Sequence, residues 1–326
     1  IRLSLVGSEM CIRDRAIVAP KRMRVTYTLT VDTNAVPAGK IIRCWLPYPR
    51  QDQARQQDVK FISASEPQYT FSSPECRHST LYMEKRAVEG EPTVFSETFE
   101  FTANGEWHNL KPEDVQPYDT TTALYKEYTA EREKHIVFSP RLRELAAKLT
   151  AGETNPYLKA KRIFRWVNDN FPWASAREYS TIENIPEYVL DNRHGDCGQV
   201  SLLFITLCRI SGIPAHFQSG FMMHPRAWNL HDWAEVYFEG VGWVPVDQSF
   251  GIPAFARNAD EEYFFLGGID SWRMIVNTDY GMPLQPEKQY PRSETVDFQR
   301  GEVEWEGGNL YFPQWGYHMD IDYLNY

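Results

Sequence analysis

The chain has 326 residues, 42% hydrophobic and 24% charged, so it is long enough for one large or two ordinary domains with hydrophobic cores. It carries 34 Lys and Arg against 44 Asp and Glu, a formal net charge of -10, which argues against nucleic acid or an anionic membrane as a partner held by positive charge. No run of about 18 apolar residues occurs, the length that a membrane-spanning helix needs. We therefore expect a globular body without an integral membrane segment.

The opening residues 1–15 resemble the translation of an adaptor used in transposon-based sequencing libraries. A segment of that kind is set aside in fold reasoning, and we expect the natural amino terminus, with any signal peptide, to be missing. Five cysteines are too few for a disulfide-dense scaffold. One of them, Cys11, belongs to the opening segment, which leaves Cys44, Cys76, Cys197 and Cys208.

Residues 16–130 read as a β-rich domain. Polar and apolar residues alternate with a period of two, and β-branched and aromatic residues are frequent, which indicates half-buried antiparallel strands. The expected strands cover residues 25–31, 40–46, 79–85 and 93–102, and the last is expected to close at Asn104-Gly105. The pattern predicts a β-sandwich or barrel of about 100 residues.

Residues 131–270 change to helices followed by strands, which indicates a separate α+β domain. Ser139-Pro140 and Asn155-Pro156 each place a capping residue before a helix-starting proline, and a third helix is expected from Cys197 to Gly212. Three strands are expected next, at residues 215–223, 231–238 and 242–246. The tail, 271–326, is aromatic and acidic, and we expect it to pack on this second domain as irregular strands.

Cys197 is the first candidate for chemistry. It lies in Gly195-Asp196-Cys197-Gly198-Gln199, just before an apolar-periodic run, and is therefore expected in the first turn of a buried helix. Unpaired N–H groups and the helix dipole favour anions there, so we expect the thiol pKa to be lowered. A small buried core residue is the other reading of an unpaired cysteine, and these features alone leave both open. Cys208, deeper on the apolar stripe, reads as core.

His231 is the candidate base and Asp247 the candidate partner that orients it. On the strand 231–238, His231, Trp233 and Glu235 share one face, and the other face reads as core through Ala234, Val236 and Phe238. Asp247 ends the next strand, where a carboxylate can accept the second N–H of the imidazole. Alone, a strand histidine is usually structural and an Asp after Val-Pro-Val is usually a turn former. A zinc site made of Cys197, His231 and Asp247 lacks CxxC or HxxxH spacing and is not expected.

Together these segments resemble the transglutaminase-like superfamily of papain-type cysteine enzymes. The matching pieces are the stretch 195–198 at a helix start, 209–215 at its end, 231–237 and 242–247, in that order. The resemblance implies a transglutaminase-like α+β catalytic domain, a nucleophile-bearing helix on an antiparallel sheet, preceded by a β-sandwich-like domain. It also implies Cys197 as nucleophile, His231 as general base and acid, and Asp247 as orienting residue, with no cofactor.

Candidates for holding the oxyanion or contacting the substrate are Trp173, Tyr179, Gln199 and Trp233, besides the backbone N–H of Cys197. The expected reaction is acyl transfer on amide bonds of a peptide or protein through a thioester, with hydrolysis of the peptidase or amidase type favoured. Crosslinking or deamidating transglutaminase activity and a non-catalytic binding module on the same fold are the alternatives. The acidic and aromatic stretch 302–306 weakly suggests a carbohydrate-processing protein with paired carboxylates. We expect an exported bacterial protein, periplasmic or on the cell surface.

Overall fold

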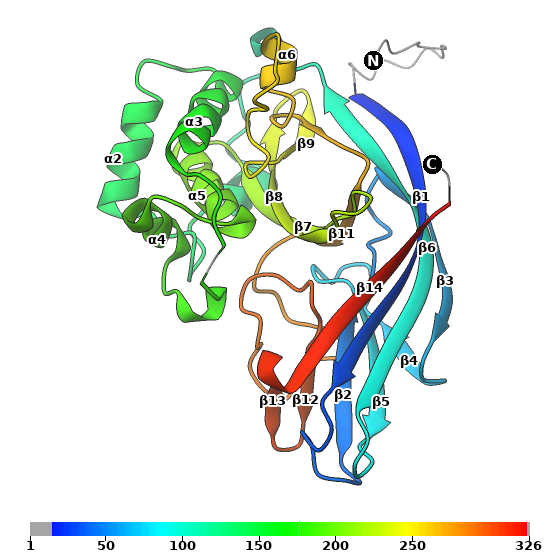
Figure 1. Cartoon of the computed structure of the whole chain (residues 1–326). Helices are drawn as coiled ribbons and strands as arrows, with labels where there is room; N and C mark the ends of the chain where they lie inside the picture. The colour runs from blue at the N-terminus through cyan, green and yellow to red at the C-terminus, as the bar shows by residue number, and fades with distance from the viewer. Residues whose placement is uncertain (1–14, 176, 325–326) are drawn as a thin grey trace.

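The computed structural model describes residues 15–175 and 177–324, and its helices gather on one side of three antiparallel sheets (Figure 1). One five-stranded sheet contains β1 (Arg15–Val31), β3 (Gln56–Ala64), β6 (Thr93–His108), β10 (Gly268–Ile269) and β14 (Trp315–Tyr323). The other contains β2 (Ile41–Pro47), β4 (Tyr69–Phe71), β5 (Thr80–Arg86), β12 (Glu302–Trp305) and β13 (Gly308–Leu310). A four-stranded sheet has the order β11 (Arg273–Asn277), β7 (Ala215–Met222), β8 (Asn229–Phe238) and β9 (Gly242–Val246).

The two five-stranded sheets enclose one apolar core between them. Along β1, every second side chain is buried in it: Met23, Val25, Tyr27, Leu29 and Val31. This period-two burial is what the sequence alternation predicts for strands with one face in a core. Strand β6 departs from the expectation, because it does not close at Asn104-Gly105 but continues to His108, where it pairs with the beginning of β1 and with β10.

The helices are α1 (Ala123–Tyr128), α2 (Pro140–Leu149), α3 (Pro156–Asn170), α4 (Ile185–Asn192), α5 (Cys197–Ile210) and α6 (Ala259–Glu262), with short 3₁₀ turns at Pro112–Asp114, Tyr179–Thr181 and Phe312–Gln314. The expected caps form: the Ser139 side chain accepts a hydrogen bond from the Leu142 N–H at 3.2 Å, and Asn155 accepts one from the Leu158 N–H at 3.2 Å. Helix α4 was not expected, although Asn184 caps it before Pro186.

Helix α5 is the centre of the α+β part. It contacts α2, α3, α4, β7 and β8, and its residues from Gly198 to Arg209 are all buried. A helix that is apolar all round is stable only in such an interior position. Because α5 packs directly on β8, its first turn lies near the part of β8 that carries His231.

The C-terminal segment packs on the second domain, as expected, and also pairs with strands of the N-terminal sheets. Strand β11 does join the sheet of β7, β8 and β9, but β12 pairs with β2, and β14 pairs with β1 over nine residue pairs. Figure 1 shows β14 running alongside β1, where it pairs with Met23–Val31. The tail therefore contributes regular strands to both parts of the chain: β11 to the sheet of β7, β8 and β9, and the long alternating strand β14 to the N-terminal sheet. None of the helices within the described residues is long and apolar enough to cross a membrane.

Candidate active site

The first turn of α5 presents Cys197. Asp196 is the N-cap, and its carboxylate accepts a hydrogen bond from the Gln199 N–H at 3.0 Å. The Gln199 side-chain oxygen in turn accepts from the Asp196 N–H at 3.4 Å, which completes a capping box. This local arrangement fixes Cys197 as the first helical residue, where backbone N–H groups have no acceptor within the helix.

His231 and Asp247 are joined by a hydrogen bond of 2.8 Å between Nε2 and Oδ2. The register of β8 and β9 pairs Ala234 with Val246, so Asp247 follows β9 beside the start of β8. Asp247 also pairs with the buried guanidinium of Arg273 at 2.8 Å and accepts two backbone N–H groups, from Ser249 and Phe250. These contacts hold a fully buried carboxylate in one orientation against the imidazole.

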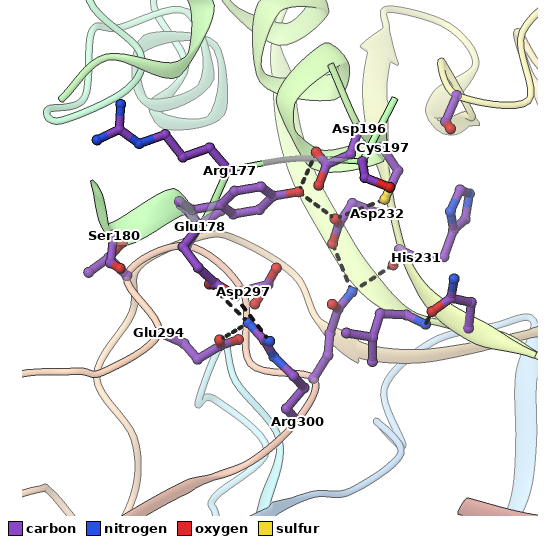
Figure 2. A pocket seen from close by; sticks show the side chains of 18 of the residues that line it. Arg177, Glu178, Ser180, Asp196, Cys197, His231, Asp232, Glu294, Asp297 and Arg300 are labelled. Carbon is purple, nitrogen blue, oxygen red and sulfur yellow. Dashed lines mark hydrogen bonds and ion pairs between the residues drawn. The ribbon is translucent and has the colours of Figure 1, made fainter. Parts of the chain in front are cut away.

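A cavity of about 600 Å³ brings Cys197 and His231 together. Its lining comes from four parts of the chain: Trp173, Ser175 and residues 177–180; the start of α5; the end of β7 and the start of β8 with the loop after β9; and the C-terminal stretch 293–300. Figure 2 shows Asp196, Cys197 and Asp232 on one side and Glu294, Asp297 and Arg300 on the other. Segments far apart in sequence therefore build one site.

The thiol of Cys197 donates to Oδ2 of Asp232 at 3.3 Å. The Tyr179 hydroxyl is 2.6 Å from Asp196 and 3.3 Å from Asp232, and the amide of Gln299 donates to Oδ1 of Asp232 at 2.8 Å. The close approach requires glycine at position 198: a Cβ there would lie 2.4 Å from the Tyr179 hydroxyl and 2.7 Å from Oδ2 of Asp232. The nucleophile candidate is thus set in a network of carboxylates.

This network corrects the expected thiol chemistry. Burial, followed by the charges of Asp232 and Asp196, raises the pKa of Cys197 well above its usual value. Burial raises the pKa of Asp196 to about 6, and burial with the neighbouring Asp297 and Asp196 raises that of Asp232. The helix dipole at the start of α5 favours a thiolate, but two carboxylates at short range oppose it, so the thiol is the resting form.

Burial lowers the pKa of His231, and the charge of Asp247 only partly offsets this. Burial of Asp247 would raise its own pKa, but His231 and Arg273 outweigh burial and hold it below the usual value. The resting pair is therefore a neutral imidazole and an ionised carboxylate. A neutral imidazole is the form that can accept a proton from a thiol.

The other four predicted contact residues divide into two pairs. Trp173 and Tyr179 line the cavity, and Trp173 is 59% exposed at its edge. Gln199 and Trp233 are fully buried and do not line it. Gln199 serves the capping box, and the Trp233 indole donates to Gln218 at 2.6 Å, so the structure does not place either in contact with a substrate.

Sequence reasoning missed Asp232, Arg273 and the stretch 293–300. Asp232 follows His231 on β8, so it falls on the face that otherwise reads as core; an ionisable residue there is a usable signal of function. Arg273 begins a strand whose next three residues are apolar, which is a similar signal. The contribution of residues 293–300 depends on tertiary packing, for which the sequence carries no local pattern.

The carboxylates of the stretch 302–306 do not form an open pair. Glu302 and Glu304 are fully buried, and both pair with Lys288. Glu302 also pairs with Arg292, and Glu304 with Arg43. Within the described residues, no group of three or more His, Cys, Asp or Glu side chains is arranged to hold a metal ion.

Comparison with known proteins agrees with the fold. Residues 143–248 match the transglutaminase-like superfamily, so this part of the chain is a transglutaminase-like domain. The chain superimposes with a TM-score of 0.61 on the crystal structure of a protein from Cytophaga hutchinsonii described as a candidate cysteine protease; identity is 15%, over 96% of this chain and 93% of that one. A likeness at this identity establishes the shared fold.

Two relatives of uncharacterised function are detectable by sequence. YebA of Bacillus subtilis is 27% identical over 140 residues, which cover 37% of this chain and 19% of YebA. A protein of Haemophilus influenzae is 24% identical over 260 residues, 68% of each chain. The chain thus matches only a small part of YebA and about two thirds of the second relative.

Proposed function

We propose that the protein is a cysteine-dependent hydrolase of amide bonds in peptides or proteins, with Cys197, His231 and Asp247 as its catalytic residues. The observation that carries the proposal is the 2.8 Å contact between His231 and Asp247 beside a cavity that Cys197 also lines. A nucleophile, a base and a residue that orients the base are the three parts that thiol acyl transfer needs.

The contact with Asp247 supports an assignment of the ring nitrogens of His231. Because Nε2 is bonded to Asp247, we propose that Nδ1 accepts the thiol proton. The sulfur then attacks the amide carbonyl, and Nδ1 returns the proton to the nitrogen as the C–N bond breaks. The amine leaves and a thioester remains. In the second step Nδ1 takes a proton from water, the hydroxide attacks the thioester, and the sulfur leaves as thiolate and recovers the proton.

The first turn of α5 also offers a hydrogen-bond donor to the negative charge that develops on the carbonyl oxygen. The Cys197 N–H is one of the helix-start donors, and a donor of this kind stabilises the tetrahedral intermediate. Tyr179 is a poor second donor in this conformation, because its hydroxyl is engaged by Asp196 at 2.6 Å. Trp173 remains our proposal for the second donor, since it lines the cavity at its exposed edge.

The test is peptide hydrolysis in H₂¹⁸O, followed by mass spectrometry of a peptide mixture treated with the purified protein. We expect new carboxyl groups that carry one ¹⁸O atom. Cys197→Ala should abolish them, and His231→Ala should slow their formation by about 10²–10⁴-fold. Cys208→Ala is the matched control, since Cys208 lies on the same helix but is buried in the core.

Each contrary result has a definite meaning. Full activity of Cys197→Ala would exclude the proposal. Products joined to an added amine in place of ¹⁸O would replace hydrolysis with transamidation. If no bond is cleaved or formed and Cys197 resists alkylation as fully as Cys208, the protein is a binding module on this fold.

A further inference from the structure

The charges that line the cavity are strongly unbalanced. Five carboxylates lie there: Glu178, Asp196, Asp232, Glu294 and Asp297. The lining has two guanidinium groups, Arg177 and Arg300. Arg300 is paired with Glu178 at 3.2 Å and with Glu294 at 2.5 Å, and the charge of Asp297 also acts on it, so within the described residues the uncompensated aspartates of the lining are Asp196 and Asp232.

Two of the aspartates lie close to the thiol: Oδ2 of Asp232 is 3.3 Å from the sulfur, and Asp196 directly precedes Cys197. Asp232 is 1% exposed and Asp297 8% exposed. Asp297 and Asp196 both act on Asp232 by like-charge repulsion, as its raised pKa shows after the effect of burial. Carboxylates in such a position are stabilised by a positive charge placed among them.

Glu294 is an independent sign that something binds here. Glu294 is only 6% exposed, and it lines the cavity beside Asp297 (Figure 2). One of its oxygens is held by Arg300, whereas Oε2 has no N–H or hydroxyl donor among the described residues, and the carboxyl group of Glu294 interacts with that of Asp297. A buried polar atom without a partner is costly, and a donor from a ligand would relieve that cost.

We propose that these carboxylates form a subsite for an ammonium group of the acyl donor, so that the enzyme acts on the amide bond next to a free amino terminus. The inference rests on the proposed function and adds the substrate class. The subsite is made of Asp232 and Asp297, with Asp196 and Glu294 around them.

The distances favour an ammonium group close to the reacting carbonyl. Oδ2 of Asp232 is 3.3 Å from the sulfur of Cys197. A carbonyl carbon ready for attack lies about 3–3.5 Å from the nucleophile. An α-ammonium nitrogen is two bonds of about 1.5 Å from that carbon. A carboxylate in contact with the sulfur is therefore within hydrogen-bond reach of the α-ammonium group, whereas an N-acylated residue offers no positive charge there.

The experiment compares two electrophiles that differ only in this group: alanine chloromethyl ketone with a free ammonium group, and its N-acetyl derivative. Labelling of Cys197 is followed by peptide mass spectrometry, and each rate is divided by the rate with free cysteine in solution. We expect the ammonium compound to label at least 10-fold faster than the acetylated one. The preference should fall toward equality in Asp297→Asn and in Glu294→Gln. Glu91→Gln, which removes an exposed charge from the loop between β5 and β6, is the control and should keep it.

The outcomes separate this inference from the proposed function. Equal labelling by the two ketones, with rapid alkylation of Cys197 by neutral iodoacetamide, would overturn the subsite and leave the nucleophile standing. Equal labelling together with protection by methylammonium would place the cation on an acceptor amine and overturn the assignment to the acyl donor. A preference that is unchanged in both carboxylate variants would also overturn the subsite. Failure of every reagent to label Cys197 would be evidence against the proposed function itself.

Discussion

Arg273 offers the sharpest test of how the site is held together. Its buried guanidinium contacts Asp247 at 2.8 Å and Asp270 at 2.7 Å and lies over the ring of Phe250, 4.4 Å from the ring centre. Arg273→Met keeps the volume but leaves the ionised Asp247 in the interior with the neutral imidazole of His231 as its remaining side-chain partner. Removing one partner of a buried ion pair typically costs about 3–5 kcal/mol, because the other charge stays desolvated.

This cost predicts a measurable change in thermal stability. With an unfolding entropy of about 2.1 cal/mol/K per residue, the chain loses about 1 °C of Tm for each 0.7 kcal/mol, so Arg273→Met should lower Tm by about 4–7 °C. Scanning calorimetry checks this against Arg257→Met, which removes an exposed i,i+4 pair with Glu261 and should change stability by about 0–1 kcal/mol. The double variant Arg273→Met/Asp247→Asn should regain part of the loss, since position 247 then carries no buried charge that needs the guanidinium.

Arg273 also affects the titration of the imidazole. Its positive charge contributes to the lowered pKa of His231, after burial, so the variant should have a higher His231 pKa. The acidic limb of the pH profile for Cys197 alkylation should then move to higher pH. A fall in Tm no larger than that of the surface control, with an unshifted profile, would refute the view that Arg273 holds Asp247 and through it His231.

Three further predictions follow from single contacts. Gly198→Ala should lower Tm and slow alkylation of Cys197, because the new Cβ would lie 2.4 Å from the Tyr179 hydroxyl. Alanine is the better helix former by about 1 kcal/mol, so a raised Tm would show that this clash is absent and would contradict the prediction. Asp232→Asn should speed alkylation of Cys197 by iodoacetamide at pH 7, because burial, Asp232 and Asp196 raise the thiol pKa and the variant removes one of the two charges; slower alkylation would contradict it. Glu97→Gln should raise Tm at pH 7, because burial without partners raises the Glu97 pKa. Below about pH 4.3 folded and unfolded chains both hold that proton, so the stability penalty grows as pH rises above this value, and calorimetry should find the gain vanishing near pH 4.

Local patterns in the sequence predicted the elements that carry the triad candidates. Ser139-Pro140 and Asn155-Pro156 start α2 and α3, and the apolar run after Cys197 is α5. Caps and apolar periodicity depend only on neighbouring residues, so they can be read without knowledge of the fold. The domain limits drawn from these patterns are not tested and stay predictions.

The pairing of strands that are far apart in the sequence could not be predicted from local patterns. β14 completes a sheet with β1, almost 300 positions away in the sequence, and β6 passes through Asn104-Gly105 because both β1 and β10 pair with its last residues. An Asn-Gly pair is a turn signal when nothing else is known, but pairing on both sides outweighs it. The segment 293–300 enters the cavity for a similar reason, since the strands before and after it in the chain, β11 and β12, are fixed on the distant partners β7 and β2.

The electrostatics of the site reverse the pKa shift that the local sequence predicts for Cys197. Position at the start of α5 predicts a readily ionised thiol, yet Asp232 lies 3.3 Å from the sulfur and opposes its ionisation. The same carboxylate is the one that we assign to the ammonium group. A cation bound there would offset the charge that suppresses the thiolate, and by linkage a thiolate would strengthen binding of the cation by the same factor. In this arrangement the nucleophile stays protonated in the empty cavity and is activated when a substrate of the right charge arrives, so selection of the substrate and ionisation of Cys197 become one event.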